Sequence, residues 1–226
     1  QLFGFGGFIL VSNLINTLCD NIQGLLLGKF ATASTLGLYT QARKLEEISS
    51  TSISSIVNQV AYPVLSQEQD DKTALTNIIR KFITLIATLV FPLMFYLIII
   101  AEPLITFLYS DKWIECVPYF QILCVAGLAI CLQSINLNAI AAIGKSKTMF
   151  KWTIVKRVSG LVLNIGGLLL YGVYGLLFGG VITAFLLYTI NALLVAKHIG
   201  YKFSTQIKHL SPILFSSLVS FIVSVF

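Results

Sequence analysis

The sequence predicts an all-α integral membrane protein, a helical bundle of about seven transmembrane helices. Its 226 residues are 57% hydrophobic and 11% charged, with a mean hydropathy of +0.89, whereas a soluble domain averages about 25% charged residues. Apolar runs recur along the whole chain, which excludes a soluble protein with a single signal peptide. The longest polar connector, near residues 66–72, is too short to hold an inserted soluble domain.

Seven apolar segments have the length of about 20 residues that a helix needs to cross the hydrocarbon core. Between the third and the fourth, the segment Glu102–Asp111 is too short to cross, and Phe107, Tyr109 and Trp113 predict that it lies along the membrane interface. In chain order, the seven segments are residues 3–28, 36–64, 76–100, 116–143, 148–170, 174–197 and 207–226.

The distribution of basic residues predicts which side of the membrane each connector faces. Most of the 15 Lys and Arg residues flank the connectors after the second, fourth and sixth spans, and such a bias marks the cytoplasmic side. The first span is therefore expected to begin in the cytoplasm. The same bias accounts for the net charge of +6, so nucleic-acid binding is not expected. The residues concerned are Lys72, Arg80, Lys81, Lys145, Lys147, Lys151, Lys156, Arg157, Lys197, Lys202 and Lys208.

The second predicted span carries a polar stripe. On a helix with about 100° per residue, one side of residues 36–64 is polar within a stripe about 80° wide, and the opposite side is apolar. Because lipid cannot satisfy polar groups, this stripe must meet water or polar groups on other helices. The stripe consists of Arg43, Glu47, Ser50, Ser54 and Asn58.

Three other spans repeat this pattern. One polar stripe can be a contact between helices, but several stripes, two of which carry Arg, indicate the walls of a hydrated cavity. The stripes consist of Ser12, Asn16, Asp20 and Gln23 in the first span, Ala126, Ala129, Gln133 and Asn136 in the fourth, and Thr153, Arg157, Gly160, Asn164 and Gly167 in the fifth.

Two charges are expected at one depth in the membrane. A hairpin that turns near residues 31–32 places Asp20 and Arg43 at the same level, and a direct pair would lower the cost of burying each charge. The alternative is a locked ion pair with no role in ligand binding. Lys44 points away from the stripe, and both Lys44 and Lys156 are expected to extend to the membrane surface.

The sequence shows no pattern typical of an enzyme. The four cysteines form no CxxC pair and are expected to be small buried hydrophobic residues. His198 and His209 show no metal-ligand spacing, and the doublet of Asp70 and Asp71 fits a solvated turn. Neither catalysis, nor a metal, nor a cofactor is therefore expected.

Four stretches resemble a known family. Asp20–Leu45, "DNIQGLLLGKFATASTLGLYTQARKL", is similar to the D…GKF…LG…Y-x-x-A pattern of bacterial polysaccharide flippases. These are the Wzx-type lipid-linked oligosaccharide flippases of the multidrug/oligosaccharidyl-lipid/polysaccharide (MOP) exporter superfamily. Tyr62–Asp71 resembles the element that closes their next span, Phe91–Trp113 their proline-containing helix and interfacial segment, and Ala142–Lys147 their short cytoplasmic turn. The order and spacing of these motifs cover about residues 3–200.

The resemblance implies a fold of two six-helix lobes that face each other across a central cavity, as in MATE-like transporters. Residues 1–200 would form the C-terminal six-helix lobe, and residues 201–226 an extra C-terminal transmembrane helix. The N-terminal lobe is expected to be absent from this sequence, which begins with Gln1.

The resemblance also implies a function at the bacterial inner membrane. Undecaprenyl-diphosphate-linked oligosaccharide repeat units would be moved across it by alternating access, for O-antigen (lipopolysaccharide), capsule or exopolysaccharide synthesis. The partners would be this lipid-linked oligosaccharide, membrane lipids, and the polysaccharide polymerase and chain-length machinery. If an ion gradient supplies the energy, Asp20 or Glu47 would be the proton-linked carboxylate.

The stripes supply the side chains for such a substrate. Arg43 and Arg157 would bind the diphosphate, since Arg forms forked, charge-assisted bonds to phosphate oxygens. Polar side chains would replace water around the sugar hydroxyls. The remaining members of this cavity would be Asn16, Asp20, Glu47, Ser50, Ser54, Asn58, Gln133, Asn136 and Asn164.

Other classes stay open at this point. A multidrug exporter of the same superfamily would favour acidic and aromatic groups for cationic drugs, whereas two stripes here carry Arg. A lipid II flippase has similar physics with a different headgroup. A membrane polysaccharide polymerase requires a large extracytoplasmic loop, and no connector is long enough. In a non-transporting scaffold, the stripes would only join helices.

Overall fold

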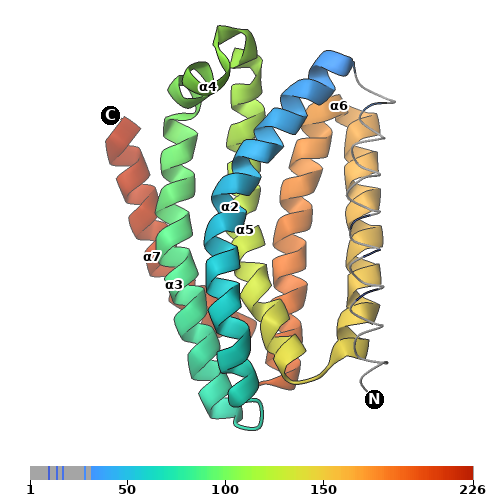
Figure 1. Ribbon diagram of the computed structural model, residues 1–226, viewed down its shortest axis with the longest axis vertical. Coiled ribbons are helices and arrows are strands. Elements are labelled where there is room, and N and C mark those ends of the chain that lie inside the picture. The colour runs from blue at the N-terminus through green and yellow to red at the C-terminus, as the bar shows by residue number, and fades with distance from the viewer. Residues whose placement is uncertain (1–9, 11–13, 15–16, 18–27, 29–31, 226) are drawn as a thin grey trace.

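The computed structural model of the chain is a bundle of helices (Figure 1). It describes residues 10, 14, 17, 28 and 32–225, and within that part every regular element is an α-helix or a 3-10 helix. The predicted all-α class is confirmed. The first predicted span, residues 3–28, lies outside the described residues apart from those four single positions.

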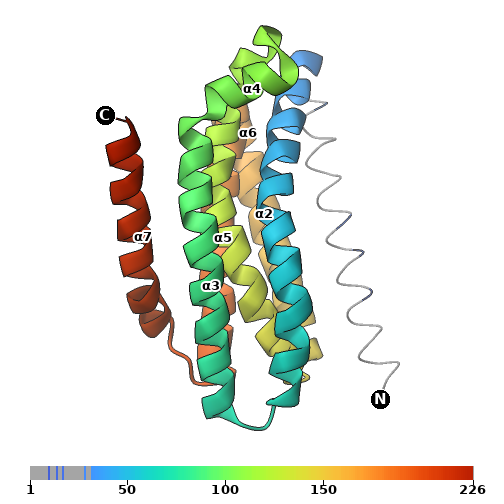
Figure 2. The same cartoon turned by 60° about the vertical axis from the view of Figure 1, so that its left-hand side comes forward.

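Two long helices open the continuous part of the chain. Helix α2 spans Ala33–Gln67 and helix α3 spans Lys72–Ile99, and they run antiparallel (Figure 2). The carboxylate of Asp71 accepts hydrogen bonds from the backbone N–H groups of Thr73 and Ala74 at 2.7 and 3.0 Å. Asp71 therefore caps α3 by pairing donors that the first turn of a helix leaves unpaired.

A short segment then crosses one end of the bundle. Helix α4 spans Ala101–Tyr109, and the 3-10 helix η1 spans Asp111–Cys116, at the end opposite the α2–α3 connector (Figure 1). The Tyr109 and Trp113 rings lie side by side, with centroids 6.1 Å apart. With 9 residues, α4 is too short to cross a membrane, as the sequence predicts.

Helix α5, Val117–Ala142, is the central element of the bundle. It packs against α2, α3 and α6, and its Phe120 and Ile135 are completely buried. The cysteines at its start and within it are buried and free, as expected for small hydrophobic residues. These are Cys116, Cys124 and Cys131, whereas Cys19 lies outside the described residues.

Helix α6, Ser146–His198, is a hairpin of two legs. Tyr171 (φ −131°, ψ 17°) and Gly172 (φ 62°, ψ −145°) depart from helical geometry, and the chain reverses there (Figure 1). Glycine occupies the position with positive φ, where a side chain would be strained. The break lies between the fifth and sixth predicted spans, residues 148–170 and 174–197.

Two glycines bring the legs of α6 together next to this turn. A Cβ atom on Gly167 would lie 2.2 Å from the backbone oxygen of Gly175, and one on Gly175 would lie 2.0 Å from the backbone oxygen of Gly167. Neither position has room for a side chain, which agrees with the role of glycine in close helix packing within membranes.

Helix α7, Phe203–Val225, packs mainly against α3 (Figure 2). Near its start, the buried Gln206 joins α5 and α6. Its Oε1 accepts hydrogen bonds from Asn136 Nδ2 and from the Tyr188 hydroxyl, and its Nε2 donates to Asn136 Oδ1, each at 3.3 Å. Further along, the rings of Phe95 and Phe221 lie 5.5 Å apart. We call Asn136, Tyr188 and Gln206 the polar knot.

Four helices of the described part are long and apolar enough to cross a membrane. They are Lys72–Ile99, Asp111–Ala142, Thr148–His198 and Phe203–Ser224, and the third contains both legs of α6. Helix α2 is not among them, which agrees with the four charges at residues 43–47. The chain is thus a multi-pass membrane protein, and seven spans stay a prediction.

The connectors that carry most of the basic residues share one end of the bundle. The α2–α3, α5–α6 and α6–α7 connections lie together there, and α4 and η1 lie at the other end (Figure 1). This placement agrees with the alternation that the sequence predicts, and the side of the membrane that each end faces stays a prediction.

Candidate functional site

A polar groove runs between α2, α5 and the two legs of α6. It consists of two adjoining pockets of about 290 and 380 Å³, which share Ser50, Thr51, Gln133 and Arg157 among their lining residues. We call their union the α2–α6 groove. Both pockets open to the surface of the chain, so the groove is a cleft and not an enclosed cavity.

The stripe on α2 forms one wall of this groove. Arg43, Glu47 and Ser50 line the first pocket, and Ser50, Ser54 and Asn58 line the second. The opposite, apolar side of α2 is exposed, with 56% of Ile48, 66% of Ile56 and 55% of Val60 accessible. A helix with one polar and one apolar face is what the spacing predicts.

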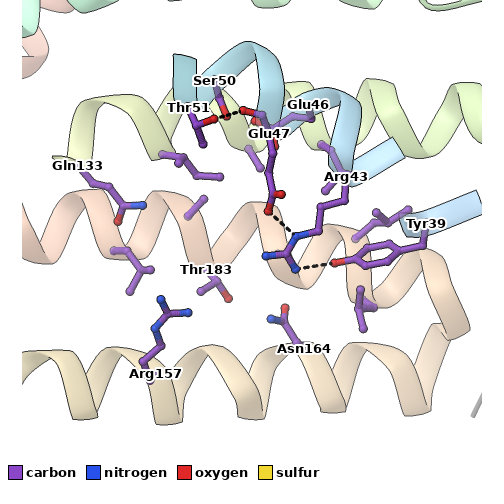
Figure 3. Close-up of a pocket in the computed structure, with 18 residues that line it drawn as sticks. Tyr39, Arg43, Glu46, Glu47, Ser50, Thr51, Gln133, Arg157, Asn164 and Thr183 are labelled. Atoms are coloured by element: carbon purple, nitrogen blue, oxygen red, sulfur yellow. Dashed lines mark hydrogen bonds and ion pairs between the residues drawn. The ribbon is translucent and has the colours of Figure 1, made fainter. Parts of the chain in front are cut away.

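Arg43 is held by two neighbours on its own helix. Its Nε donates to Glu47 Oε1 at 2.9 Å, and its Nη1 donates to the Tyr39 hydroxyl at 3.3 Å (Figure 3). Both partners are one turn away on α2, and both help to fix the direction of the guanidinium. The side chain remains 31% exposed. The predicted partner Asp20 lies outside the described residues, as does Asn16.

Arg157 and Asn164 face Arg43 from the first leg of α6. Figure 3 shows both side chains pointing into the space toward which Arg43 points from α2. Gln133 of α5 lines the same space. The structure therefore brings together polar residues from three elements, as the sequence predicts, while their role in binding a ligand stays a prediction.

Lys156 corrects one expectation from the sequence. It does not extend to the membrane surface, because it is only 7% exposed and lines the second pocket. Its Nζ donates a hydrogen bond of 2.5 Å to Asn191 Oδ1 on the second leg of α6. The Asn191 amide thus supplies one acceptor for the buried ammonium group. Lys44, in contrast, is exposed on α2.

The groove gathers polar atoms that have no hydrogen-bond partner. Within the described part of the chain, four buried side-chain atoms lack one, and all four belong to residues that line the groove. Native structures pair nearly all buried polar atoms, so each exception requires an explanation. The four atoms are Glu46 Oε1, Ser54 Oγ, Asn164 Oδ1 and Thr183 Oγ1.

Asn136 is the one described member of the predicted cavity that does not line the groove. It is completely buried and belongs to the polar knot with Gln206. Its side of α5 faces Gln206 near the start of α7. The sequence pattern groups Asn136 with Gln133 because they are three residues apart, but they still point about 60° apart around the helix. Asn136 therefore meets Gln206 and not the groove.

Several lining residues were missed by reasoning from the sequence. Glu46 lies next to the stripe residue Glu47, Tyr39 lies one turn before Arg43, and Asn191 lies on a span without a recognised stripe. Asn191 is an isolated amide in an apolar span, a signal that marks a polar contact in a membrane protein. Among the described residues, no group of three His, Cys, Asp or Glu side chains could hold a metal ion.

Comparisons with known proteins identify relatives of this chain. It is 31% identical over 172 residues to the teichuronic acid biosynthesis protein TuaB of Bacillus subtilis, an alignment that covers 76% of the chain and 33% of TuaB. It is 26% identical over 156 residues to the lipopolysaccharide biosynthesis protein WzxC of Escherichia coli, covering 67% of the chain and 31% of WzxC. The succinoglycan biosynthesis transport protein ExoT of Rhizobium meliloti is 21% identical over 157 residues, which cover 70% of the chain and 31% of ExoT.

The chain spans about a third of the length of these three curated relatives. No solved structure matches it significantly. The sequence profile of a family described as "Polysaccharide biosynthesis protein" matches residues 1–118, which is more than half of the chain. The chain therefore belongs to the polysaccharide biosynthesis protein family of Wzx-type flippases, within the MOP exporter superfamily.

Proposed function

We propose that the complete protein moves undecaprenyl-diphosphate-linked oligosaccharide repeat units across the bacterial inner membrane for surface polysaccharide synthesis. The relatives are named for the biosynthesis of teichuronic acid, lipopolysaccharide and succinoglycan, and one of them is named as a transport protein. No bond is made or broken in this proposal. The protein supplies a polar path for a headgroup that cannot enter about 30 Å of hydrocarbon unaided.

The unpartnered atoms of the α2–α6 groove are the observation that carries this proposal. Ser54 Oγ, Asn164 Oδ1 and Thr183 Oγ1 are buried without a partner beside the same groove. Hydroxyl and amide groups of this kind exchange hydrogen bonds readily with sugar hydroxyls. A groove that only joined helices would be expected to pair these atoms internally.

The guanidinium groups would bind the diphosphate. Arg43 and Arg157 point toward the same space from α2 and α6 (Figure 3), and Arg is suited to forked contacts with phosphate oxygens. The polyprenyl tail would stay in lipid. The groove in this chain would form one side of the path, and a second lobe of the complete protein the other, so that rocking of the lobes opens it to alternate sides.

The test is transport by variants of the complete protein. In a strain that lacks the protein, lipid-linked repeat units should accumulate in the inner leaflet, and the unmodified gene should restore the surface glycan. We expect Arg43→Gln and Arg157→Gln each to lower the transport rate about tenfold or more, because a hydrogen bond to a charged group contributes about 1.5–3 kcal/mol.

Lys44→Gln is the matched control for Arg43→Gln. It removes a positive charge from the next residue, but Lys44 is exposed and does not line the groove. We expect it to transport at the normal rate. Equal rates for all three variants would overturn the role of the groove. Export of cationic dyes without flipping of repeat units would instead favour a multidrug exporter, and accumulation of lipid II would favour a lipid II flippase.

A further inference from the structure

We propose that Glu46 binds and releases a proton during the transport cycle, and that its protonated form holds α2 against α5. This inference rests on the proposed function and names the coupling group. The sequence favours Glu47 and Asp20 for that role. Asp20 lies outside the described residues, whereas the structure separates the environments of Glu46 and Glu47 sharply.

Glu46 and Glu47 are adjacent but point in different directions (Figure 3). Glu47 has a side chain that is 50% exposed, and its carboxylate pairs with Arg43 at 2.9 Å. Glu46 is only 3% exposed, and its Oε1 has no hydrogen-bond partner. The Glu47 carboxylate therefore already has an ion-pair partner and contact with solvent, whereas Glu46 Oε1 has neither.

The surroundings of Glu46 fit a neutral carboxyl group. Its Oε1 lies against Gly127 of α5, where an added Cβ would be only 2.7 Å away, and the Met94 thioether of α3 lies beside the same glycine. The Cys124 and Cys131 thiols of α5 are also near. An ionised carboxylate in these surroundings would be costly to desolvate, because its buried Oε1 has no hydrogen bond to offset the burial.

Charged groups lie within reach but on the groove side. Arg43 and Glu47 are on α2 itself and interact with Glu46 through space. Arg157 of α6 lines the same pocket, as does Tyr39 of α2. The Ser50 side chain, one turn later on α2, lies beside the carboxyl. Glu46 therefore lies between an apolar contact with α5 and a polar groove that carries positive charge.

This position couples the proton to the packing of α2. When α2 separates from α5, water reaches the carboxyl group, its O–H bond breaks, the proton passes to water, and the electron pair stays on the carboxylate. The charged form is then favoured by water and by the nearby guanidinium of Arg43. Because the neutral form favours the closed contact and the charged form the open one, protonation shifts the population between the two states.

Infrared difference spectroscopy on the purified complete protein tests the protonation directly. We expect the C=O stretch of a protonated carboxylic acid at neutral pH in the unmodified protein, its loss in Glu46→Gln, and its retention in Glu47→Gln. A spectrum without this band, or a band that Glu46→Gln leaves in place, would overturn the proposal. This readout does not depend on transport.

A second measurement tests coupling. The complete protein in vesicles of Escherichia coli polar lipid would be given undecaprenyl diphosphate linked to N-acetylglucosamine, with and without an imposed pH gradient. We expect the gradient to accelerate flipping by the unmodified protein and by Glu102→Gln, an exposed carboxylate on α4. The acceleration should be lost in Glu46→Gln.

In this assay, Glu47→Gln should change the basal rate but keep the ratio of rates with and without the gradient. If the pH gradient still accelerates flipping by Glu46→Gln, the role of Glu46 is contradicted and the proposed function is not. The proposed function would be contradicted if the unmodified protein does not flip this lipid and if a strain that lacks the protein also makes its surface glycan normally. The infrared result would still decide the protonation state of Glu46.

Discussion

Neighbouring residues on α2 have opposite environments because a helix turns by about 100° per residue. Arg43 lines the groove, whereas Lys44 is exposed on the outside of the helix. In the same way, Glu47 is exposed to solvent, whereas Glu46 is buried. The cluster of four charges therefore divides between a polar groove, an apolar contact with α5, and the outer surface. A loop would give these residues no such division.

At the residue scale, the contact between Lys156 and Asn191 should contribute to stability. In Asn191→Leu, the ammonium loses the acceptor that lies 2.5 Å away and stays buried. We expect the free energy of unfolding to fall by about 1.5–3 kcal/mol, the usual contribution of a hydrogen bond to a charged group. Thermal unfolding of the complete protein in detergent measures this change.

The double variant Lys156→Met with Asn191→Leu is the control for that experiment. It removes both polar partners and should recover most of the lost stability, since replacing both partners by apolar groups is often nearly neutral. If Asn191→Leu alone unfolds at the same temperature as the unmodified protein, the contact does not stabilise the fold.

At the scale of elements, the hairpin of α6 and the attachment of α7 show how the bundle is closed. The legs of α6 meet at two glycines without side chains between them. Helix α7 is tied to α5 and α6 through the polar knot. The hairpin supplies one wall of the groove, and Gln206 at the start of α7 pairs with Asn136 on another side of α5.

The close approach of the legs predicts a large difference between two adjacent glycines. In Gly167→Ala, the new methyl group would lie 2.2 Å from the backbone oxygen of Gly175, and backbone cannot move away cheaply. We expect a loss of about 1–3 kcal/mol, typical of overpacking. Gly166→Ala, where no atom lies within 4 Å, should unfold at the normal temperature. Equal stability of the two variants would contradict the close approach.

The polar knot predicts that α7 depends on Gln206. In Gln206→Leu, Asn136 and Tyr188 lose their partner while they remain buried, at a cost of about 1–3 kcal/mol. We expect α7 to become sensitive to limited proteolysis at the α6–α7 connector. Adding Asn136→Leu and Tyr188→Phe to Gln206→Leu should restore much of the resistance to proteolysis. If Gln206→Leu alone is as resistant as the unmodified protein, the polar knot does not hold α7 in place.

At the scale of the whole molecule, the basic connectors share one end of the bundle and α4 and η1 occupy the other (Figure 1). The positive-inside rule assigns the basic end to the cytoplasm. The α2–α6 groove extends along the bundle between these ends, from Tyr39 near the α4 end to Asn58 nearer the basic end. A polar path in this direction is what transfer between leaflets requires.

This orientation predicts the labelling of two exposed lysine positions, each replaced by cysteine. In intact spheroplasts, a membrane-impermeant maleimide should react with Lys112→Cys in η1 and should not react with Lys145→Cys in the α5–α6 connector. Lys145→Cys should react once the membrane is permeabilised. The parent protein gives the background, as its described cysteines are buried. The reverse pattern would invert the orientation.

The sequence by itself determined the all-α class, the break between the legs of α6 and the membership of one stripe on α2. These features depend on periodicity and on the length of apolar segments, which are properties of one stretch of the chain. The stripe residues Arg43 and Ser54 line the groove as predicted because both faces of a single helix can be read from its own spacing.

Only the tertiary structure decided which polar residues meet. Asn136 pairs with Gln206 and lies outside the groove, Lys156 points inward because Asn191 lies opposite, and Glu46 is buried against Gly127. Each of these outcomes depends on a residue more than 30 positions away in the chain. A periodic pattern contains no information about such a partner, and in a bundle the partner decides whether a polar group is satisfied or left free for a ligand.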